Sequence, residues 1–225
     1  MLVKHIMTEN VITVTKNTHI TEALRIMKEH HFRRLPVVDK GKVVGIISQN
    51  KIEHVSPQTT APAVWQLAWL VHHTKVGDVM RDKVIVVSPD TTVEKAIAIA
   101  QHHKVGALMI CKNRKIVGIA TTNDFFYRVL NPTLGIGEPG TRIEIRNIND
   151  LSLLEEIIGC INKVGVKIKV LWALPFAITK EKGVVIHLDT DDATTAIKQL
   201  KKAGFKATIR GHIHESTDLG CACEL

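Results

Sequence analysis

Over the first 130 residues of the chain, the spacing of apolar positions switches between the pattern of strands and the pattern of helices. A β-branched run at residues 11–14 predicts a short strand, and apolar residues three and four apart between Ile20 and Met27 predict a helix. Apolar runs at residues 35–38 and 43–47, separated by a tight turn, predict two further strands. A second helix is expected directly after them, so the segment has the order β-α-β-β-α.

The same pattern recurs after a shift of 73 residues, without a gap, over some fifty positions. Met7 falls on Met80 under this shift, and residues 44–48 fall on residues 117–121. A gapless match of this length predicts an internal repeat, in which two equivalent units are built from one pattern.

The spacing of apolar positions no longer follows the repeat after residue 140. Residues 131–140 are rich in Gly and Pro and are interpreted as a linker. The expected strands lie at 142–148, 166–178, 184–188 and 205–210, and the expected helices at 151–164 and 191–203. This β-α-β-β-α-β order predicts a ferredoxin-like sheet, so the fold class is α/β (α+β) throughout.

Three motifs in the repeated segment carry a family resemblance. They are Met7-Thr8 at the end of the opening, Arg33-Arg-Leu-Pro-Val-Val-Asp39 in the middle, and Gly118-Ile-Ala-Thr-Thr-Asn-Asp124 at the end. The pattern resembles the cystathionine-β-synthase (CBS) domain, and two in tandem resemble a Bateman module. The resemblance implies a non-catalytic regulator that binds AMP, ADP, ATP or S-adenosylmethionine in clefts between the two units.

The resemblance also sets the expected domain boundaries. CBS unit one covers 1–58, a connecting helix 59–74, CBS unit two 75–130, the linker 131–140, a third domain 141–212 and a tail 213–225. We expect the connecting helix to pack between the repeats rather than on a membrane surface, since it lacks a dense Lys/Arg face. The third domain resembles an ACT domain in element order, and the whole architecture resembles the acetoin-utilisation accessory proteins (AcuB).

The final motif of unit two has a physical rationale for nucleotide binding. A helix is expected to begin just after Thr121, and the unpaired N–H groups of a helix start favour a phosphate. Thr121 can donate its hydroxyl to a phosphate or ribose oxygen, and Asp124 can accept hydrogen bonds from both ribose hydroxyls. The alternative is that Thr121 caps the helix and Asp124 complements its dipole. The repeat context favours the nucleotide interpretation.

The two units differ at the positions that matter most. Unit one has Lys51 where unit two has Asp124, and a lysine cannot accept from a ribose diol. In the resembled family a basic pair before the Leu-Pro-Val strand of the opposite unit often holds phosphate. Arg33 and Arg34 stand there in unit one, although they can also be ordinary surface charges that pair with Asp39; unit two has Gly106-Ala107. We therefore predict one competent cleft and one degenerate cleft.

The resemblance further implies an adenine-binding wall in the competent cleft. Carried over position by position, its residues are Met80, Lys83, Ile85, Val105 and Gly106. Gly106 would allow a close backbone approach.

The tail contains a candidate metal site. His212 and His214 would share one face of a strand, and Cys221 and Cys223 add two thiolates. Two imidazoles and two thiolates suit zinc. The spacing matches no established motif, and a frayed polar terminus is the alternative interpretation.

Composition and charge narrow the function further. The chain of 225 residues has 30 basic and 22 acidic side chains, a net charge of +8, which suits an anionic partner. Nucleic acid is disfavoured because the chain has one Tyr and few aromatic residues for base stacking. Sequence motifs of hydrolases, P-loop nucleotidases and zinc peptidases are lacking, so we expect no enzyme activity.

Localisation and assembly follow by expectation. The longest apolar run, residues 170–178, is too short to cross a bilayer, and no signal peptide is recognisable at the start, which predicts a cytoplasmic protein. CBS pairs and ACT domains commonly associate, so a homodimer that regulates another protein is expected by analogy. The alternative function is a dimerisation scaffold, or a regulator responsive to an amino acid or metal, whose CBS pair has no nucleotide role.

Overall fold

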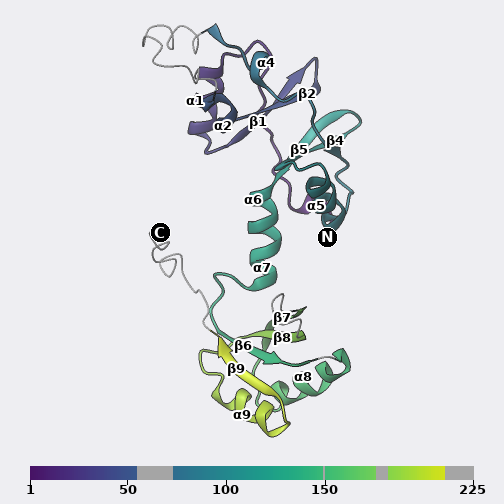
Figure 1. Cartoon of the computed structure of the whole chain (residues 1–225), viewed down its shortest axis with the longest axis vertical. Helices are drawn as coiled ribbons and strands as arrows, with labels where there is room; N and C mark the ends of the chain where they lie inside the picture. The colour runs from purple at the N-terminus through teal and green to yellow at the C-terminus, as the bar shows by residue number, and fades with distance from the viewer. Residues whose placement is uncertain (55–72, 149, 176–181, 211–225) are drawn as a thin grey trace. The chain divides into compact units, whose positions relative to one another are not determined.

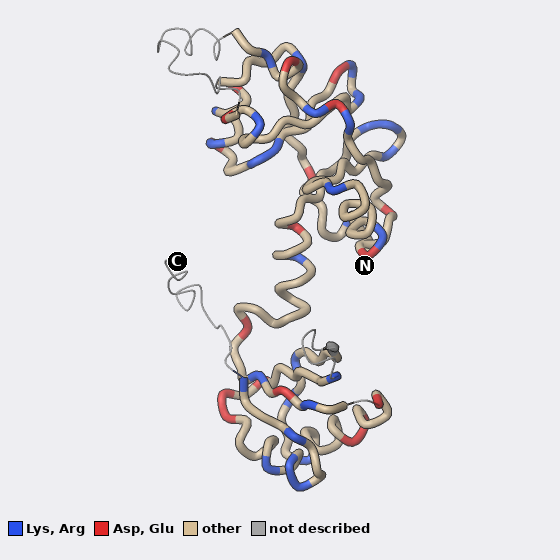
Figure 2. The backbone as a smooth tube through the Cα atoms, in the orientation of Figure 1, with Lys and Arg blue, Asp and Glu red and all other residues tan. Residues whose placement is uncertain are grey.

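The computed structural model describes residues 1–54, 73–148, 150–175 and 182–210 (Figure 1). The expected connecting helix, apart from its last two positions, and the expected tail lie outside the described residues. The chain divides into two compact units, Met1–Arg128 and Val129–Leu225. In the described part of the chain, no helix combines the length and the apolar character needed to cross a membrane. Lys and Arg are distributed over both units (Figure 2).

The first unit contains two halves with equivalent elements, as the repeat predicts. The first half comprises η1 (Val3–His5), α1 (Ile20–Glu29), β1 (Arg34–Asp39), β2 (Lys42–Ser48) and α2 (Gln49–Glu53). The second comprises α4 (Val76–Val79), β3 (Val86–Val87), α5 (Val93–His102), β4 (Ala107–Lys112), β5 (Lys115–Thr121) and α6 (Thr122–Phe125). In each half two antiparallel strands form a hairpin.

The opening strand is better formed in the second half than in the first. There β3 pairs in parallel with β4. In the first half the equivalent pairing is one parallel bridge between Val14 and Val37, so the strand predicted at residues 11–14 is reduced to a single position. The helix predicted from Ile20 is confirmed: α1 turns Ile20, Ala23 and Met27 into the core, the spacing of one helical face.

The two halves exchange their opening segments. Thr8 pairs with Ile119 of β5, and Arg81 pairs with Ile46 of β2, so each opening segment lies along the hairpin of the other half. Glycines make this contact possible: a Cβ on Gly118 would lie 2.5 Å from the sulfur of Met7. The equivalent Cβ on Gly45 would lie 2.6 Å from the sulfur of Met80.

The second unit has the predicted order of elements. Its sheet contains β6 (Thr141–Arg146), β7 (Ile168–Pro175), β8 (Lys182–Leu188) and β9 (Lys206–Arg210), and its helices are η3 (Leu151–Leu153), α8 (Leu154–Asn162) and α9 (Thr194–Lys202). The strand order is β7-β8-β6-β9 and every pairing is antiparallel. This is the topology of a ferredoxin-like fold.

The sheet of the second unit is apolar on one face and charged on the other. Ile143 and Ile145 of β6 belong to the core with α8 and α9. Glu144 between them points the other way and accepts hydrogen bonds from Arg146 and Arg210, which together lower the pKa of its carboxyl, with Arg210 contributing most. The alternation follows from the two-residue period of a strand.

The predicted linker is partly ordered, which corrects the expectation for residues 131–140. η2 (Phe126–Leu130) is a π-helix and α7 (Asn131–Leu134) follows it directly. Pro132 is tolerated because it stands in the first turn of α7, where an N–H is not required. Gly135, at a left-handed φ of 64°, ends the helix.

Candidate functional site

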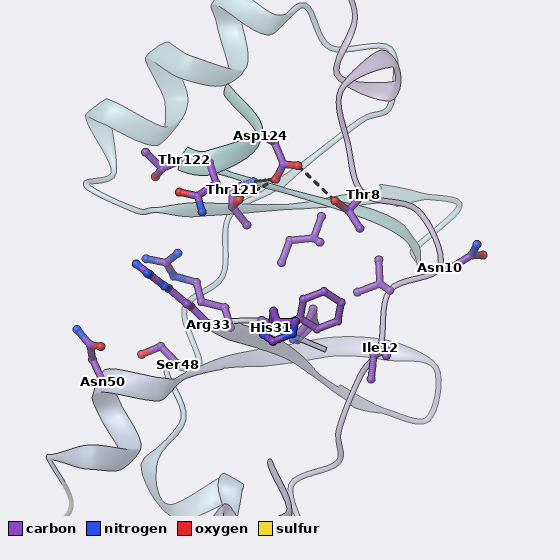
Figure 3. Close-up of a pocket in the computed structure, with 16 residues that line it drawn as sticks. Thr8, Asn10, Ile12, His31, Arg33, Ser48, Asn50, Thr121, Thr122 and Asp124 are labelled. Atoms are coloured by element: carbon purple, nitrogen blue, oxygen red, sulfur yellow. Dashed lines mark hydrogen bonds between the residues drawn. The ribbon is translucent and has the colours of Figure 1, made fainter. Parts of the chain in front are cut away.

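A pocket of about 400 Å³ lies between the two halves of the first unit (Figure 3). Its polar lining residues are Thr8, Asn10, His31, Arg33, Arg34, Ser48, Asn50, Thr121, Thr122, Asn123 and Asp124, and its apolar lining residues are Val11, Ile12, Phe32, Pro36 and Ile119. We call it the Asp124 pocket. It combines the opening segment of the first half with the end of the second, as the exchange of opening segments requires.

Asp124 stands in the first turn of α6 and is held by three hydrogen bonds. Its Oδ2 accepts from the backbone N–H of Thr121 at 2.8 Å and from the Thr121 hydroxyl at 2.7 Å. Its Oδ1 accepts from the Thr8 hydroxyl at 3.3 Å and lies 3.6 Å from Nε of Arg128. The side chain is 11% exposed. The carboxylate therefore caps the helix through Oδ2, and Oδ1 keeps acceptor capacity on the pocket side.

Thr121 has a different hydrogen-bonding state from the one expected. Its hydroxyl donates a hydrogen bond to Oδ2 of Asp124, so it is not free to donate to a ligand as the sequence suggested. The oxygen retains lone pairs and can accept from a ligand hydroxyl. The pair Thr121–Asp124 therefore presents acceptors to the pocket, which is the character needed for a diol.

Arg33 and Arg34 line the pocket from the first half, and Figure 3 shows Arg33 on the side of the pocket opposite Asp124. Arg34 begins β1, where it is paired with Ser48, and Arg33 precedes it. Neither guanidinium has a carboxylate within 4.0 Å among the residues that the structure describes. The alternative of a surface ion pair with Asp39 is therefore not seen. Two unpaired guanidinium groups at one end of a cavity suit a phosphate.

A second pocket, of about 640 Å³, lies at the equivalent position of the repeat. It is lined by Arg34, Ile46, Ser48, Lys51, Met80, Arg81, Asp82, Lys83, Val84, Ile85, Lys104, Val105, Gly106, Ala107 and Met109. We call it the Lys51 pocket. Arg34 and Ser48 line both pockets.

The prediction of the adenine-binding residues was wrong about the pocket in which they lie. Met80, Lys83, Ile85, Val105 and Gly106 line the Lys51 pocket and none of them lines the Asp124 pocket. The reason is the exchange of opening segments, which brings residues 80–85 to the end of the first half rather than to the end of their own. By contrast, Asp124, Thr121, Arg33 and Arg34 do come together in one pocket.

Comparison with known proteins agrees with the repeat. The CBS domain profile matches residues 3–58 and 76–131. The chain is a tandem CBS-domain protein. The CBS domain-containing protein YhcV of Bacillus subtilis is 29% identical over 147 residues, which cover 65% of this chain and 98% of YhcV.

Other similar proteins match little more than half of this chain. An inosine-5'-monophosphate dehydrogenase of Korarchaeum cryptofilum is 28% identical over 132 residues, 58% of this chain but 25% of the dehydrogenase. A Vibrio cholerae protein named for acetoin utilization (AcuB) has a solved structure that superposes with a TM-score of 0.49 at 26% identity, covering 58% of this chain and 91% of that one. CBSX2, solved in complex with AMP, gives 0.48 at 24%, covering 58% and 97%.

The sequence did not identify the wall that the opening of the first CBS domain contributes. Thr8, Asn10, Val11 and Ile12 line the Asp124 pocket. The signal was present in the repeat, because shifting these residues by 73 gives Arg81 to Ile85, which line the Lys51 pocket. Which half each opening serves is decided by the fold.

The predicted metal ligands His212, His214, Cys221 and Cys223 lie outside the described residues. Within residues 1–54, 73–148, 150–175 and 182–210, no group of three or more His, Cys, Asp or Glu side chains is arranged to hold a metal ion. The tail site therefore stays a prediction from the sequence.

Proposed function

We propose that the CBS pair is a non-catalytic regulatory sensor that binds one adenosine nucleotide in the Asp124 pocket. The observation that carries the proposal is the pairing of opposite chemistries across one cavity. Asp124 offers acceptors from the second half. The guanidinium groups of Arg33 and Arg34, which have no carboxylate within 4.0 Å among the described residues, offer donors from the first half. A ribose diol needs acceptors and a phosphate needs donors.

The apolar lining gives the base a place to bind. Val11 and Ile12 come from the opening of the first half, and Ile119 comes from β5. The cavity of about 400 Å³ is within the range of small-molecule sites. The Lys51 pocket lacks the carboxylate at the equivalent helix start, so we assign the nucleoside to the Asp124 pocket alone.

Ligand binding has a direct route to a conformational response. A ribose hydroxyl at Oδ1 of Asp124 would compete with the Thr8 hydroxyl, whose hydrogen bond at 3.3 Å is the longest of the three. Thr8 belongs to the opening segment that pairs with β5, so its release changes how the two halves are held together. A ligand acts as a signal only if it binds one conformation more tightly than the other.

The output is proposed to pass to the ferredoxin-like second unit or to a partner protein. The chain that follows Asp124 runs through α6, η2 and α7 to the second unit, so the ligand lies close in sequence to the connection. We propose a homodimer as the assembly, with the second unit acting as an ACT-like domain. Light scattering with and without nucleotide measures the assembly directly.

The test is calorimetric titration and thermal unfolding with AMP, ADP, ATP, S-adenosylmethionine and adenosine. AMP comes first because CBSX2 was solved with it. A ligand at a hundred times its dissociation constant stabilises the folded chain by about 2.7 kcal/mol. We expect one site per chain, and we expect Asp124→Asn to weaken binding at least about tenfold, since asparagine has one acceptor oxygen where aspartate has two and carries an NH2 donor in place of the other.

Asp124→Asn is preferred to alanine because the asparagine oxygen can still accept from Thr121 and preserve the helix start. The matched control is Lys51→Gln at the equivalent position of the other half, which should leave AMP affinity unchanged. If none of the five compounds binds, the nucleotide proposal fails and the CBS pair is a scaffold. Equal losses in both variants would likewise contradict a single nucleotide pocket.

A further inference from the structure

The Lys51 pocket is strongly cationic. Five of its lining residues carry a positive charge: Arg34, Lys51, Arg81, Lys83 and Lys104. Asp82 is the one carboxylate in the lining. No ion pair joins any of these six side chains to another charged residue within the described part of the chain. An excess of four positive charges around one cavity favours an anion with several charges.

The charge is not a general property of the repeat, because it arises at positions where the two halves differ. Four equivalent pairs change from neutral or acidic to basic: Thr8 and Arg81, Asn10 and Lys83, His31 and Lys104, and Asp124 and Lys51. The first member of each pair lines the Asp124 pocket and the second lines the Lys51 pocket. The same architecture therefore presents two different sites.

Besides Arg34, the four other cations come from three separate parts of the chain that converge on the cavity. Lys51 lies in α2, Arg81 and Lys83 follow α4, and Lys104 follows α5. All four side chains belong to exposed residues, so each remains available to a ligand. Lysine ammonium groups interact with phosphates as point charges, and the side chain of Lys51 cannot accept hydrogen bonds from a ribose diol as Asp124 can.

We propose that the Lys51 pocket binds a polyphosphate chain and does not recognise a ribose. Two sources supply this chemistry, an inorganic polyphosphate or the triphosphate of a nucleotide whose sugar is not held. The site goes beyond the proposed nucleotide sensor, and it adds a second input to the same CBS pair. Each phosphate of the chain can meet a different lysine or arginine around the cavity.

Arg34 links the two pockets physically. It lines both of them, and its Nη2 lies 2.7 Å from the position that a Cβ on Gly106 would occupy. A guanidinium pressed against this glycine can turn toward only one bound phosphate at a time. Polyphosphate in the Lys51 pocket should therefore weaken AMP in the Asp124 pocket, and AMP should weaken polyphosphate by the same factor.

The test is calorimetric titration of the full chain with sodium tripolyphosphate at a constant ionic strength of about 0.15 M, where general charge effects are screened. We expect one saturable site, whose affinity falls at least about tenfold in the double variant Lys51→Gln with Lys83→Gln. Asp124→Asn should retain it. The matched control is Lys28→Gln, an exposed lysine of α1 outside both pockets, with an expected change below about twofold.

The source is distinguished by titrating ATP into the same variants. ATP binding that survives Asp124→Asn but is lost in the double lysine variant identifies a nucleotide triphosphate, and binding by tripolyphosphate alone identifies the inorganic anion. The proposal is overturned if tripolyphosphate does not saturate, or if Lys28→Gln loses as much affinity as the double variant. AMP binding in the Asp124 pocket is measured separately, so each proposal can fail without affecting the test of the other.

Discussion

The Asp124 and Lys51 pockets are built from equivalent positions of one repeat, yet their chemistry is opposite. One places a carboxylate at the start of its closing helix, and the other places a lysine there. The Asp124 pocket has two guanidinium groups among its lining residues, and the Lys51 pocket has five cationic side chains. The repeat forms the cavity twice, and the differences at its lining positions give each copy its own charge.

The exchange of opening segments explains why the difference is so sharp. Because each opening serves the other half, each pocket combines an opening from one copy with an ending from the other. Most lining residues therefore belong to one pocket alone. Arg34 and Ser48 are the exceptions, since they line both.

The largest expected effect comes from Lys51→Asp, which gives the Lys51 pocket the carboxylate of its twin. Tripolyphosphate affinity should fall about a hundredfold, because a cation is lost and an anion replaces it. AMP stoichiometry measured by calorimetry should rise from one to two per chain. An unchanged tripolyphosphate affinity would show that the helix start does not face the anion.

The next effect concerns the contacts that hold the exchanged openings. Gly45→Ala should lower the free energy of unfolding by about 2 kcal/mol, because the added Cβ meets both the Met80 sulfur and the Arg81 carbonyl oxygen, the latter at 2.9 Å. Gly118→Ala should cost below about 1 kcal/mol, since only the flexible side chain of Met7 must move. Urea unfolding followed by circular dichroism compares the two. A larger loss for Gly118→Ala would contradict the packing argument.

A smaller and more selective effect is expected from Arg33→Gln. Arg33 lines the Asp124 pocket but not its twin, so AMP affinity should fall about tenfold while adenosine and tripolyphosphate affinities stay the same. The comparison of AMP with adenosine isolates the phosphate. Equal losses for both compounds would place Arg33 away from the phosphate.

A weaker effect shared by both pockets is expected from Gly106→Ala. The new methyl group would displace the Arg34 guanidinium without removing its charge. AMP and tripolyphosphate affinities should each fall about threefold, and their mutual inhibition should shrink. If only one ligand is affected, Arg34 serves one pocket and the link between the two is lost.

The smallest effect on either ligand is expected from Glu144→Gln in the second unit. Arg210, and then Arg146, hold the pKa of Glu144 below its usual value of 4.5, so this carboxylate stabilises the fold above that pH and the contribution is lost as the pH falls through the lowered pKa. The variant should lose about 1 kcal/mol at pH 7 and show a flatter acid limb in urea titrations. Unequal changes in the two ligand affinities would show that the second unit distinguishes the pockets.

Much of the molecule was predictable because local patterns specify it. The 3.6-residue period placed α1, and the order of elements predicted the ferredoxin-like topology of the second unit. The difference between Asp124 and Lys51 was visible from the repeat alone. These features depend on residues close in sequence, or on residues compared at a fixed shift.

The predictions that failed depended on long-range placement. Met80 and Gly106 were assigned beside Asp124, and they line the other pocket. The Thr121 hydroxyl was expected to donate a hydrogen bond to the ligand, but it already donates to Asp124. Residues 131–140 were interpreted as a linker from their Gly and Pro content, but residues 131–134 form α7, which accepts Pro132 in its first turn.

The sequence by itself determined the repeat, the two sheet-and-helix units and the chemical inventory of the candidate sites. Hydrophobic period and residue type are local quantities, so they can be read without coordinates. Only the tertiary structure decided which opening segment closes which pocket. That choice rests on the glycines that admit Met7 and Met80 onto the opposite hairpin, a contact between residues more than thirty positions apart whose energy has no trace in the local pattern.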